Sequence, residues 1–346
     1  MDEPERANDS IAVKDLVKVY KGGVRAVDGV SFEVKAGELF AFLGPNGAGK
    51  STTIKIITTL LKPTSGTAEV LGMDVKIHSA RVRSSIGYAA QEVGIDENAT
   101  GRENLVLYGH FYRLDGKTIR RRSDELLELM DLTEESGRQV ATYSGGMRKR
   151  LDLAISIIHQ PQVLILDEPT VGLDPQTRGH IGDYIRNLVQ ELGITVLFTT
   201  HYMDEADKLS DRIAIIDHGR IITSGTPQEL KDEISGDVVS LTLTTDGAST
   251  SDGVLDSSRE MLRHQPFVRE IQEIDGDLNV YVEKGETDLP RILRVMDGNG
   301  LTVQTISLSR PTLDDVFLKY TGRTMRDEEG QRTTWARMQR DVRRRK

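Results

Sequence analysis

The first two thirds of the chain alternates short apolar runs with longer amphipathic segments. Four runs are typical of buried strands in a parallel sheet: residues 38–43, 163–166, 194–198 and 213–216. Residues 11–19 alternate apolar and polar positions, as a half-buried strand does. Apolar residues at helical spacing predict helices at residues 52–61, 100–114, 118–132, 148–158 and 176–192. Together these patterns predict an α/β fold.

The pattern changes after residue 235. Residues 238–308 read in the order strand, helix, strand, strand, helix, strand, which is the split βαβ arrangement. We therefore expect a small α+β domain, ferredoxin-like, and we find no catalytic set of residues in its sequence. A last predicted helix carries a packing or docking stripe on one face, made of Leu313, Val316, Phe317 and Tyr320.

One stretch carries the most specific chemistry. It matches the phosphate-binding pattern G-x-x-x-x-G-K-[S/T] at every fixed position, and consists of Gly44, Pro45, Asn46, Gly47, Ala48, Gly49, Lys50 and Ser51. Glycines let the backbone curl around an anion, so that N–H groups and the N-terminus of the next helix face phosphates. Lys50 is placed to reach the β- and γ-phosphates, and the Ser51 hydroxyl to bind Mg²⁺. The strand before and the helix after disfavour a chance glycine-rich turn.

Two acids follow the predicted strand at residues 163–166. Carboxylates at the end of a buried strand are costly unless they bind something. In phosphate-loop enzymes an Asp at this position holds Mg²⁺, so Asp167 is a candidate metal ligand. Glu168 can polarise an attacking water as a general base. The alternative, an ordinary helix cap, is weakened by the phosphate loop, and His201 ends another buried strand at the same predicted edge of the sheet.

Three further features gain meaning only in combination. Ser144 is a plausible N-cap, and Gly145 and Gly146 behind it open a helix whose N–H groups could grip a second anion; alone, a mere helix start is the better interpretation. Tyr20 lies in the turn after the first strand, where it could stack on adenine or cover a sheet edge; position alone leaves both open. Gln91 ends a predicted strand, which by itself is usually structural.

Composition narrows the class of protein. The 346 residues suffice for about two domains on a prior of ~150 residues each, and 37% hydrophobic with 29% charged residues is a globular profile. A net charge of -9 disfavours a general nucleic-acid binder. The chain has no cysteine, which excludes disulfides and thiol catalysis, and we see no apolar run of ~18 residues. Arg120, Arg121 and Arg122 are expected on a solvated helix face.

Taken together, these motifs resemble the ATP-binding subunits of ABC transporters, over residues 11 to about 226. Tyr20 matches their adenine-stacking aromatic, Gly44 to Ser51 their Walker A loop, and Gln91 their Q-loop glutamine; Thr52, directly after the loop, is a further implied nucleotide-binding residue. Ser144, Gly145 and Gly146 match the signature motif, although it reads Tyr-Ser-Gly-Gly-Met where Leu-Ser-Gly-Gly-Gln is commoner. Asp167 and Glu168 match Walker B, Asp174 the D-loop and His201 the switch histidine. The C-terminal half ends in Pro311-Thr312-Leu313-Asp314-Asp315-Val316-Phe317-Leu318, and with this ending it resembles the extension of the daunorubicin-resistance type of exporter subunit.

The resemblance implies a P-loop NTPase cassette with a RecA-like core, an antiparallel β subdomain and a helical subdomain at about 95–160. The implied ranges are a flexible N-terminus at 1–10, the cassette at 11–235, an accessory or regulatory domain at 236–321 and a polar basic tail at 322–346. ATP and Mg²⁺ are the implied ligands, with Ser51, Gln91 and Asp167 at the metal. Lys50, Gln91, Glu168 and His201 are the implied catalytic set.

The resemblance also implies a head-to-tail homodimer that holds each ATP between the Walker loop of one copy and the signature of the other. A separate multi-span permease would carry the substrate, so we expect the chain at the cytoplasmic face of the cell membrane, energising export of a small hydrophobic molecule such as a drug, antibiotic or lipid. The alternative is a soluble ABC-type ATPase acting on nucleic acid or ribosomes. Such proteins usually have two cassettes, coiled coils or zinc-binding inserts, and this sequence has one cassette and no cysteine.

Overall fold

The structure, a computed structural model, describes residues 9–91, 94–234, 236–244, 251–274, 277–299 and 301–323. The predicted N-terminal segment 1–10 and basic tail 322–346 fall mostly outside these residues. The described chain forms two compact units, residues 9–227 and 228–323, each of which is treated by itself. In the part of the chain that is described, no helix combines the length and the apolar character needed to cross a membrane.

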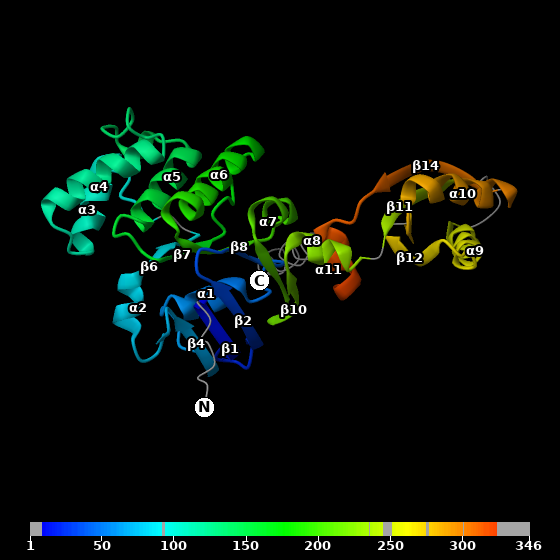
Figure 1. The fold of residues 1–346 in the computed structure, drawn as a ribbon, viewed down its shortest axis with the longest axis horizontal. Helices are drawn as coiled ribbons and strands as arrows, with labels where there is room; N and C mark the ends of the chain where they lie inside the picture. Colours follow the sequence, from blue (N-terminus) through cyan, green and yellow to red (C-terminus); the bar gives the residue numbers. More distant parts are fainter. Residues whose placement is uncertain are drawn as a thin grey trace, which may run out of the picture. The chain divides into compact units, whose positions relative to one another are not determined.

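A six-stranded sheet forms the centre of the first unit (Figure 1). Its strand order is β10 (Arg220–Gly225), β9 (Arg212–Asp217), β3 (Leu39–Leu43), β8 (Thr195–Thr200), β7 (Val163–Asp167) and β6 (Ile86–Ala89). All neighbours pair in parallel except β10 and β9. Since the parallel strands β3, β8, β7 and β6 end at the same edge, the residues that follow them are brought close together.

A second, antiparallel sheet covers this core. Its order is β2 (Arg25–Lys35), β1 (Asp9–Val19), β4 (Ser65–Val70) and β5 (Met73–Asp74). One buried cluster joins residues of both sheets to Ile54, Ile56 and Ile57 of α1 (Lys50–Ile57). Phe32 of β2 stacks on Phe40 and Phe42 of β3, with ring centroids 5.6 and 5.2 Å apart. This packing fixes where β3 ends and α1 begins.

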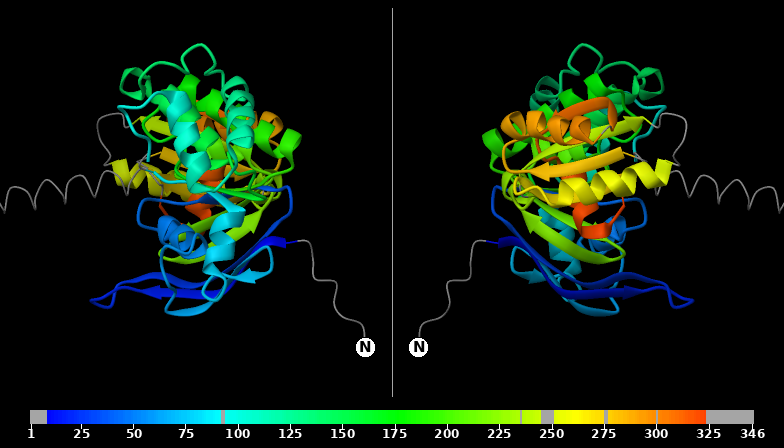
Figure 2. Two further views of the ribbon diagram at one scale, coloured as in Figure 1. Left: turned by 90° about the vertical axis from the view of Figure 1, so that its left-hand side faces the viewer. Right: turned by 90° about the vertical axis from the view of Figure 1, so that its right-hand side faces the viewer.

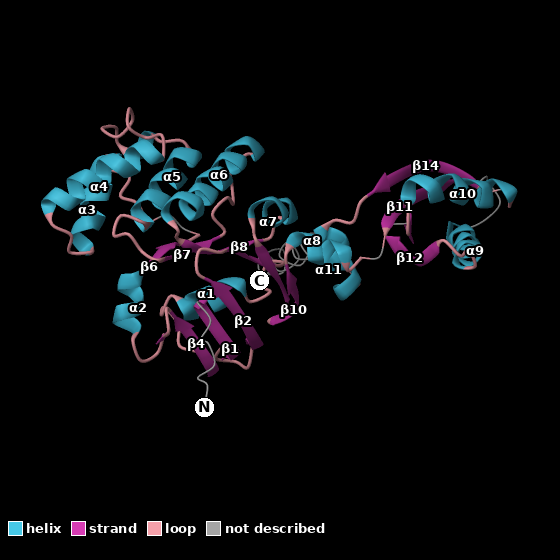
Figure 3. Ribbon diagram, in the orientation of Figure 1, coloured by secondary structure: helices cyan, strands magenta, loops and turns pink. Residues whose placement is uncertain are grey.

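A helical group lies between β6 and β7 in the sequence and contains α3 (Gly101–Phe111), α4 (Gly116–Leu129) and α5 (Gly145–Ser156) (Figure 3). Thr100 and Glu103 form a capping box at the start of α3, and Asp115 caps α4. The expectation of a solvated arginine face on α4 was wrong for Arg122, which is 7% exposed. Its guanidinium donates to Glu125 at 2.8 Å and to the Ile157 carbonyl at 3.3 Å, because the side chain spans the contact between α4 and the end of α5.

The second unit contains an antiparallel sheet in the order β12 (Val268–Ile274), β13 (Asp277–Val282), β11 (Asp237–Thr244) and β14 (Thr302–Ser309). Helices α9 (Ser251–Arg263) and α10 (Gly285–Gly298) pack on one face, and Figure 2 shows them in yellow and orange. Leu262, Ile292 and Met296 of these helices share a buried cluster with Val239 and Val280 of the sheet. The predicted ferredoxin-like α+β fold is confirmed.

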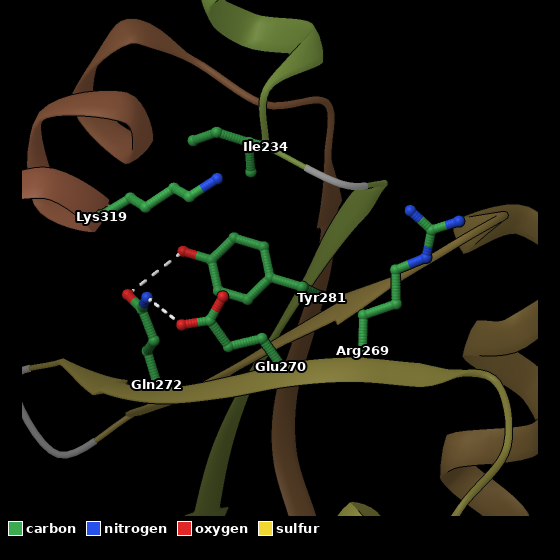
Figure 4. A pocket seen from close by; sticks show the side chains of 6 residues that line it. All are labelled: Ile234, Arg269, Glu270, Gln272, Tyr281 and Lys319. Carbon is green, nitrogen blue, oxygen red and sulfur yellow. Dashed lines mark hydrogen bonds between the residues drawn. The ribbon is translucent and has the colours of Figure 1, made fainter. Parts of the chain in front are cut away.

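A small cavity of about 180 Å³ lies beside β12 and β13, with Ile234 and Lys319 on its other side (Figure 4). Lys319 belongs to α11 (Leu313–Thr321), and Ile234 follows α8 (Pro227–Asp232). The Tyr281 hydroxyl donates to Gln272 at 3.4 Å, and the Gln272 amide donates to Glu270 at 2.8 Å. These side chains therefore form a hydrogen-bonded chain along the cavity wall.

A neutral histidine is built into the contact between the helical group and the central sheet. His159 stacks on Tyr112 with ring centroids 3.6 Å apart, and its Nε2 lies 3.0 Å from the Ile86 carbonyl, which can only accept. Nδ1 is buried and has no hydrogen-bond partner among the described residues. Burial lowers the pKa of His159 to about 4, against the hydrogen bond to Ile86, which raises it. The ring therefore carries its proton on Nε2 and stays uncharged at neutral pH.

This histidine predicts a pH dependence of stability. The unfolded chain binds a proton near pH 6.5 and the folded chain only near pH 4, so the free energy of unfolding falls as the pH drops through that window, by about 3 kcal/mol in total. His159→Phe keeps the ring and removes the titration. Urea unfolding of both proteins between pH 7.5 and 4.5 should give a steeper acid decline for the wild type, and parallel curves would contradict the assignment.

Candidate functional site

The phosphate-loop sequence forms the connection between β3 and α1. The Gly44 N–H donates to the Thr200 carbonyl at 3.2 Å, and the Ala48 N–H to the Pro45 carbonyl at 3.2 Å. Gly49 precedes α1 with φ 110°, and none of the side chains that the structure describes caps the helix. Asn46 and Gly47 are exposed at the tip, while Ala48, Gly49 and Lys50 are buried. The loop thus presents the uncapped N-terminus of α1, which favours an anion.

Two of the loop glycines are required by close packing. A Cβ on Gly44 would lie 2.2 Å from the Ile216 carbonyl oxygen of β9. A Cβ on Gly49 would lie 2.5 Å from the Ala26 carbonyl oxygen, in a backbone conformation that side chains rarely adopt. Both obstacles are backbone atoms, which cannot swing aside. The pattern of glycines in the sequence therefore reflects the approach of β2 and β9 to the loop.

Glu168 is the centre of the site. Its Oε1 lies 3.6 Å from Lys50 Nζ and 3.2 Å from His201 Nδ1, and its Oε2 accepts from Gln91 Nε2 at 3.2 Å. Glu168 is 7% exposed and Lys50 4%. The structure thus brings together the four side chains that the sequence analysis named as a catalytic set, from α1, the end of β6, and the ends of β7 and β8.

The charged groups of this cluster shift one another's pKa values. The hydrogen bond from His201 lowers the pKa of Glu168, burial raises it, and the charge of Lys50 lowers it further. Burial lowers the pKa of Lys50, and the negative charges of Glu168 and Asp167 raise it. Lys50 also donates to the carbonyls of Gly44 and Pro45 at 2.6 and 3.1 Å. Glu168 is therefore held as a carboxylate by donors on both of its oxygens.

The backbone at Glu168 adopts an uncommon conformation. Its φ is 51°, in the left-handed region that a non-glycine residue seldom occupies. The Glu168 N–H donates to Thr199 Oγ1 at 2.9 Å, and the same hydroxyl donates to Asp167 Oδ1 at 2.7 Å. Thr199 thus anchors both acids to the neighbouring strand. A left-handed residue at a strand end is the kind of strain that clusters at functional sites.

Asp167 and Ser51 meet beside this cluster. The Ser51 hydroxyl donates to Asp167 Oδ1 at 3.0 Å. Among the described residues, no group of three or more His, Cys, Asp or Glu side chains could hold a metal by itself. A hydroxyl next to one carboxylate is nevertheless the donor set that Mg²⁺ uses when phosphates and waters supply the remaining oxygens. The residues present therefore fit a magnesium ion bound together with a nucleotide.

Tyr20 lies at the mouth of the same loop. Its hydroxyl is 3.4 Å from Thr52 Oγ1 on the first turn of α1, and its side chain is exposed. Lys18 Nζ lies 5.6 Å from the centre of the ring. The aromatic ring is thus exposed beside the helix that follows the phosphate loop, which leaves a face open to stacking.

The signature residues form a second, separate cluster. Ser144 caps α5 by accepting from the Met147 N–H at 3.2 Å, as its sequence predicted. A Cβ on Gly146 would lie 2.6 Å from Thr177 of α6 (Pro175–Leu192), and Asp174 caps α6 by accepting from the Thr177 N–H at 3.0 Å. The signature and the D-loop residue therefore lie side by side, and the hydrogen bonds described for Ser144 and Asp174 stay within their own helices.

A buried ion pair connects the signature helix to the Q-loop. Lys149 Nζ lies 3.4 Å from Asp152 on the same helix and donates to the Ala90 carbonyl at 3.4 Å, next to Gln91. Burial raises the pKa of Asp152 to about 6, against the charge of Lys149, which lowers it. Lys149 thus links α5 directly to the segment that carries Gln91.

The sequence analysis missed several contributors. Thr199 holds both Walker B acids, and a buried Glu205 accepts hydrogen bonds from Thr170 and Thr200. The available signal was the pair of threonines before His201, since hydroxyls at the end of a central parallel strand face the same edge as the acids. Glu205 had a weaker signal, since it is an acid next to the apolar residues Met203, Ala206 and Leu209.

Comparison with known families agrees with this geometry. Residues 27–171 match the family described as ABC transporter. Residues 225–321 match the family described as ATP-binding protein DrrA1-3-like, C-terminal domain. The first match contains the phosphate loop, the signature and Walker B, and the second contains the ferredoxin-like sheet.

Solved structures resemble the first unit. The structure of cbiO1 from Clostridium perfringens, part of the ABC transporter complex cbiONQ, has 30% sequence identity and a TM-score of 0.62, covering 65% of this chain and 92% of that one. A dimeric post-hydrolysis structure of the ATP-binding cassette MJ0796 bound to ADP and Pi has 28% identity and a TM-score of 0.57, covering 62% of this chain and 98% of that one. These likenesses support the cassette fold.

Characterised relatives match nearly the whole chain. The daunorubicin resistance ATP-binding protein DrrA3 of Streptomyces coeruleorubidus is 40% identical over 330 residues, covering 93% of this chain and 99% of the relative. The linearmycin resistance ATP-binding protein LnrL of Bacillus subtilis is 36% identical over 317 residues, covering 92% and 100%. The chain therefore belongs to the ABC transporter family, as an ATP-hydrolysing ATP-binding subunit of the daunorubicin-resistance type.

Proposed function

We propose that this chain hydrolyses ATP with Glu168 as the base that activates water, and that it thereby energises export of a small hydrophobic molecule through a separate membrane subunit. The observation that carries the proposal is the Glu168 cluster, in which Lys50, Gln91 and His201 surround one buried carboxylate next to a phosphate loop. Donors that crowd a carboxylate are also suited to a γ-phosphate, because both are anionic oxygens.

The γ-phosphate would change the environment of Glu168. Lys50 now lies 3.6 Å from its carboxylate and helps to lower the pKa of Glu168. When Lys50 turns to a phosphate, that lowering effect weakens, and the negative charge of the phosphate raises the pKa of Glu168. A carboxylate with a higher pKa is a better base for the attacking water. His201, which lies 3.2 Å from Glu168, would donate to the phosphate.

Mg²⁺ would be held by Ser51 and Asp167, and by Gln91, whose amide donates to the neighbouring Glu168. It supplies neutralisation of the charge that develops on the β- and γ-phosphate oxygens. Tyr20 would cover the adenine, and Gly44 to Thr52 would enclose the phosphates.

We also propose a head-to-tail homodimer. Ser144, Gly145, Gly146 and Asp174 form a cluster of their own, with a solvent-exposed helix start that suits an anion. A second copy of the chain can bring its phosphate-bound ATP to this cluster. The dimeric cassette structure that resembles the first unit supports this arrangement.

An apolar patch on α3 is our proposed contact for the membrane subunit. Leu107 and Phe111 are exposed, Phe111 by 67%, and the Phe111 ring packs edge-on against Tyr108 with centroids 5.6 Å apart. The Tyr108 hydroxyl donates to the Gly94 carbonyl, close in sequence to Gln91. A permease segment that covers this patch would press on the loop that carries Gln91, and the chain would then lie at the cytoplasmic face of the cell membrane.

Glu168→Gln should abolish turnover without abolishing ATP binding. Glutamine keeps the shape and the contacts to Lys50 and His201 but cannot accept the proton of water. We expect the rate of phosphate release to fall by about 10²-fold or more, and an ATP-dependent dimer to accumulate in size-exclusion chromatography. The matched control is Asp183→Asn, an acid of α6 outside the cluster. Full ATPase activity in Glu168→Gln would refute the assignment of the base.

Phe111→Ser should separate ATP hydrolysis from transport. The substitution removes exposed apolar area without touching the Glu168 cluster, so the isolated chain keeps its ATPase rate. Co-purification with a multi-span membrane protein and ATP-driven export should both weaken. Leu192→Ser, which alters an exposed leucine at the end of α6, serves as the control. Unchanged co-purification and export in Phe111→Ser would eliminate this patch as the contact.

A further inference from the structure

A buried acid lies one turn beyond the switch histidine. Glu205 belongs to α7 (Met203–Leu209), where it shares the buried side with Met203, Ala206 and Leu209. Its side chain is 7% exposed. Burial raises the pKa of Glu205, and its hydrogen bonds to two threonines lower it in part. A carboxyl group in such a place is costly unless its hydrogen bonds are satisfied.

Both oxygens of Glu205 are satisfied, and by different loops. Thr170 Oγ1 donates to Oε1 at 2.8 Å, and Thr200 Oγ1 donates to Oε2. Thr170 is two residues after Glu168, and Thr200 is the residue directly before His201. Both threonines are almost completely buried. The carboxylate therefore bridges the segment that follows the catalytic glutamate and the strand end that carries the histidine.

The bridge supports the contact between Glu168 and His201, which requires that the segments carrying both residues are in place. Glu168 Oε1 and His201 Nδ1 are 3.2 Å apart, and Glu168 holds its side chain there from a left-handed backbone. Thr200 also accepts from the Tyr202 N–H at 3.0 Å, which fixes the turn after His201. On the other side, the Leu173 N–H donates to the Thr170 carbonyl at 3.2 Å, just before Asp174.

We propose that Glu205 is a positioning residue for ATP hydrolysis, which ties the Glu168 segment to the His201 segment through Thr170 and Thr200. The same tie reaches the D-loop through Leu173, so one carboxylate fixes three functional segments relative to one another. This inference rests on the proposed roles of Glu168 and His201. Glu205 itself touches neither ATP nor the reacting water in this scheme.

A carboxylate suits this task because two donors arrive from two directions. Glutamine has the same shape but only one oxygen, so its NH₂ group would face one of the two hydroxyls. That hydroxyl can accept in turn, which restores part of the bridge. Alanine removes the bridge and leaves both hydroxyls without their acceptor in a buried place. The structure therefore predicts a graded series, with Glu205→Gln between the wild type and Glu205→Ala.

The test measures steady-state ATP hydrolysis by the full chain with Mg²⁺ and ATP. In Glu205→Ala we expect kcat to fall about 10- to 100-fold, since a shift of the base by a fraction of an ångström is enough. KM for ATP should stay within about threefold, because the phosphate loop is unaffected. Glu205→Gln should recover part of kcat. Asp204→Asn, the exposed neighbour on the same helix, should behave as the wild type.

A milder variant guards against misfolding. Thr170→Val removes one hydroxyl and keeps the side-chain volume, so it cuts the tie on the Glu168 side alone. We expect it to lower kcat, and we expect Glu205→Ala combined with Thr170→Val to lose no more than Glu205→Ala by itself, because both changes break one bridge. Thermal unfolding and ATP binding of each variant show whether the fold has survived.

Wild-type kcat in a folded Glu205→Ala or Thr170→Val variant would overturn the proposal. So would losses that multiply in the double variant, or a fall in kcat matched by an equal loss of ATP affinity, since these indicate a general structural role. Glu168→Gln is measured in parallel. If that variant keeps full activity, the proposed function fails, whereas an inactive Glu168→Gln beside an unaffected Glu205→Ala rejects the positioning role alone.

Discussion

The burial of one carboxylate constrains the whole cassette. Glu168 is almost removed from water, and its charge is tolerated only because Lys50, Gln91 and His201 supply donors from three other elements. The buried carboxylate is stable only when all three donors are in place, so the position of each donor depends on the positions of the other two. The parallel register of β3, β8 and β7 brings these elements to one edge, and the packing of α1 between the two sheets sets the position of Lys50.

Much of this arrangement could be predicted from sequence, for a physical reason. Buried parallel strands are continuously apolar, so their ends are marked by polar residues: Asp167 and Glu168 directly follow Leu166, and His201 follows Phe198 after two threonines. The split βαβ order of the second unit was likewise visible in its alternating strands. The catalytic roles of these residues remain predictions, whereas their proximity is a property of the fold.

What the sequence concealed depends on contacts between distant segments. Arg122 belongs to a run of three arginines that is typical of a solvated helix face. Its guanidinium nevertheless donates to the carbonyl of Ile157 at the C-terminal end of α5. Glu205 reads as one more acid of a polar helix, and its partners Thr170 and Thr200 come from the neighbouring loop and from the end of β8. No periodic pattern in the neighbouring sequence indicates that either side chain is buried. In both cases a charged residue is buried because backbone or hydroxyl groups meet its charge there.

At Glu168, the backbone conformation that places the carboxylate for its proposed role in catalysis also lowers the stability of the fold. With φ at 51°, any residue other than glycine lowers the free energy of unfolding by on the order of 1 kcal/mol, and a glycine here would relieve that strain. Selection for a more stable fold alone would therefore remove the glutamate. The same position also resists stabilising redesign, because glycine and asparagine, which suit the turn better, lack the carboxylate, and aspartate carries it on a shorter side chain. A thermostabilised variant of this protein would have to gain its stability at other positions and keep the strained backbone at Glu168.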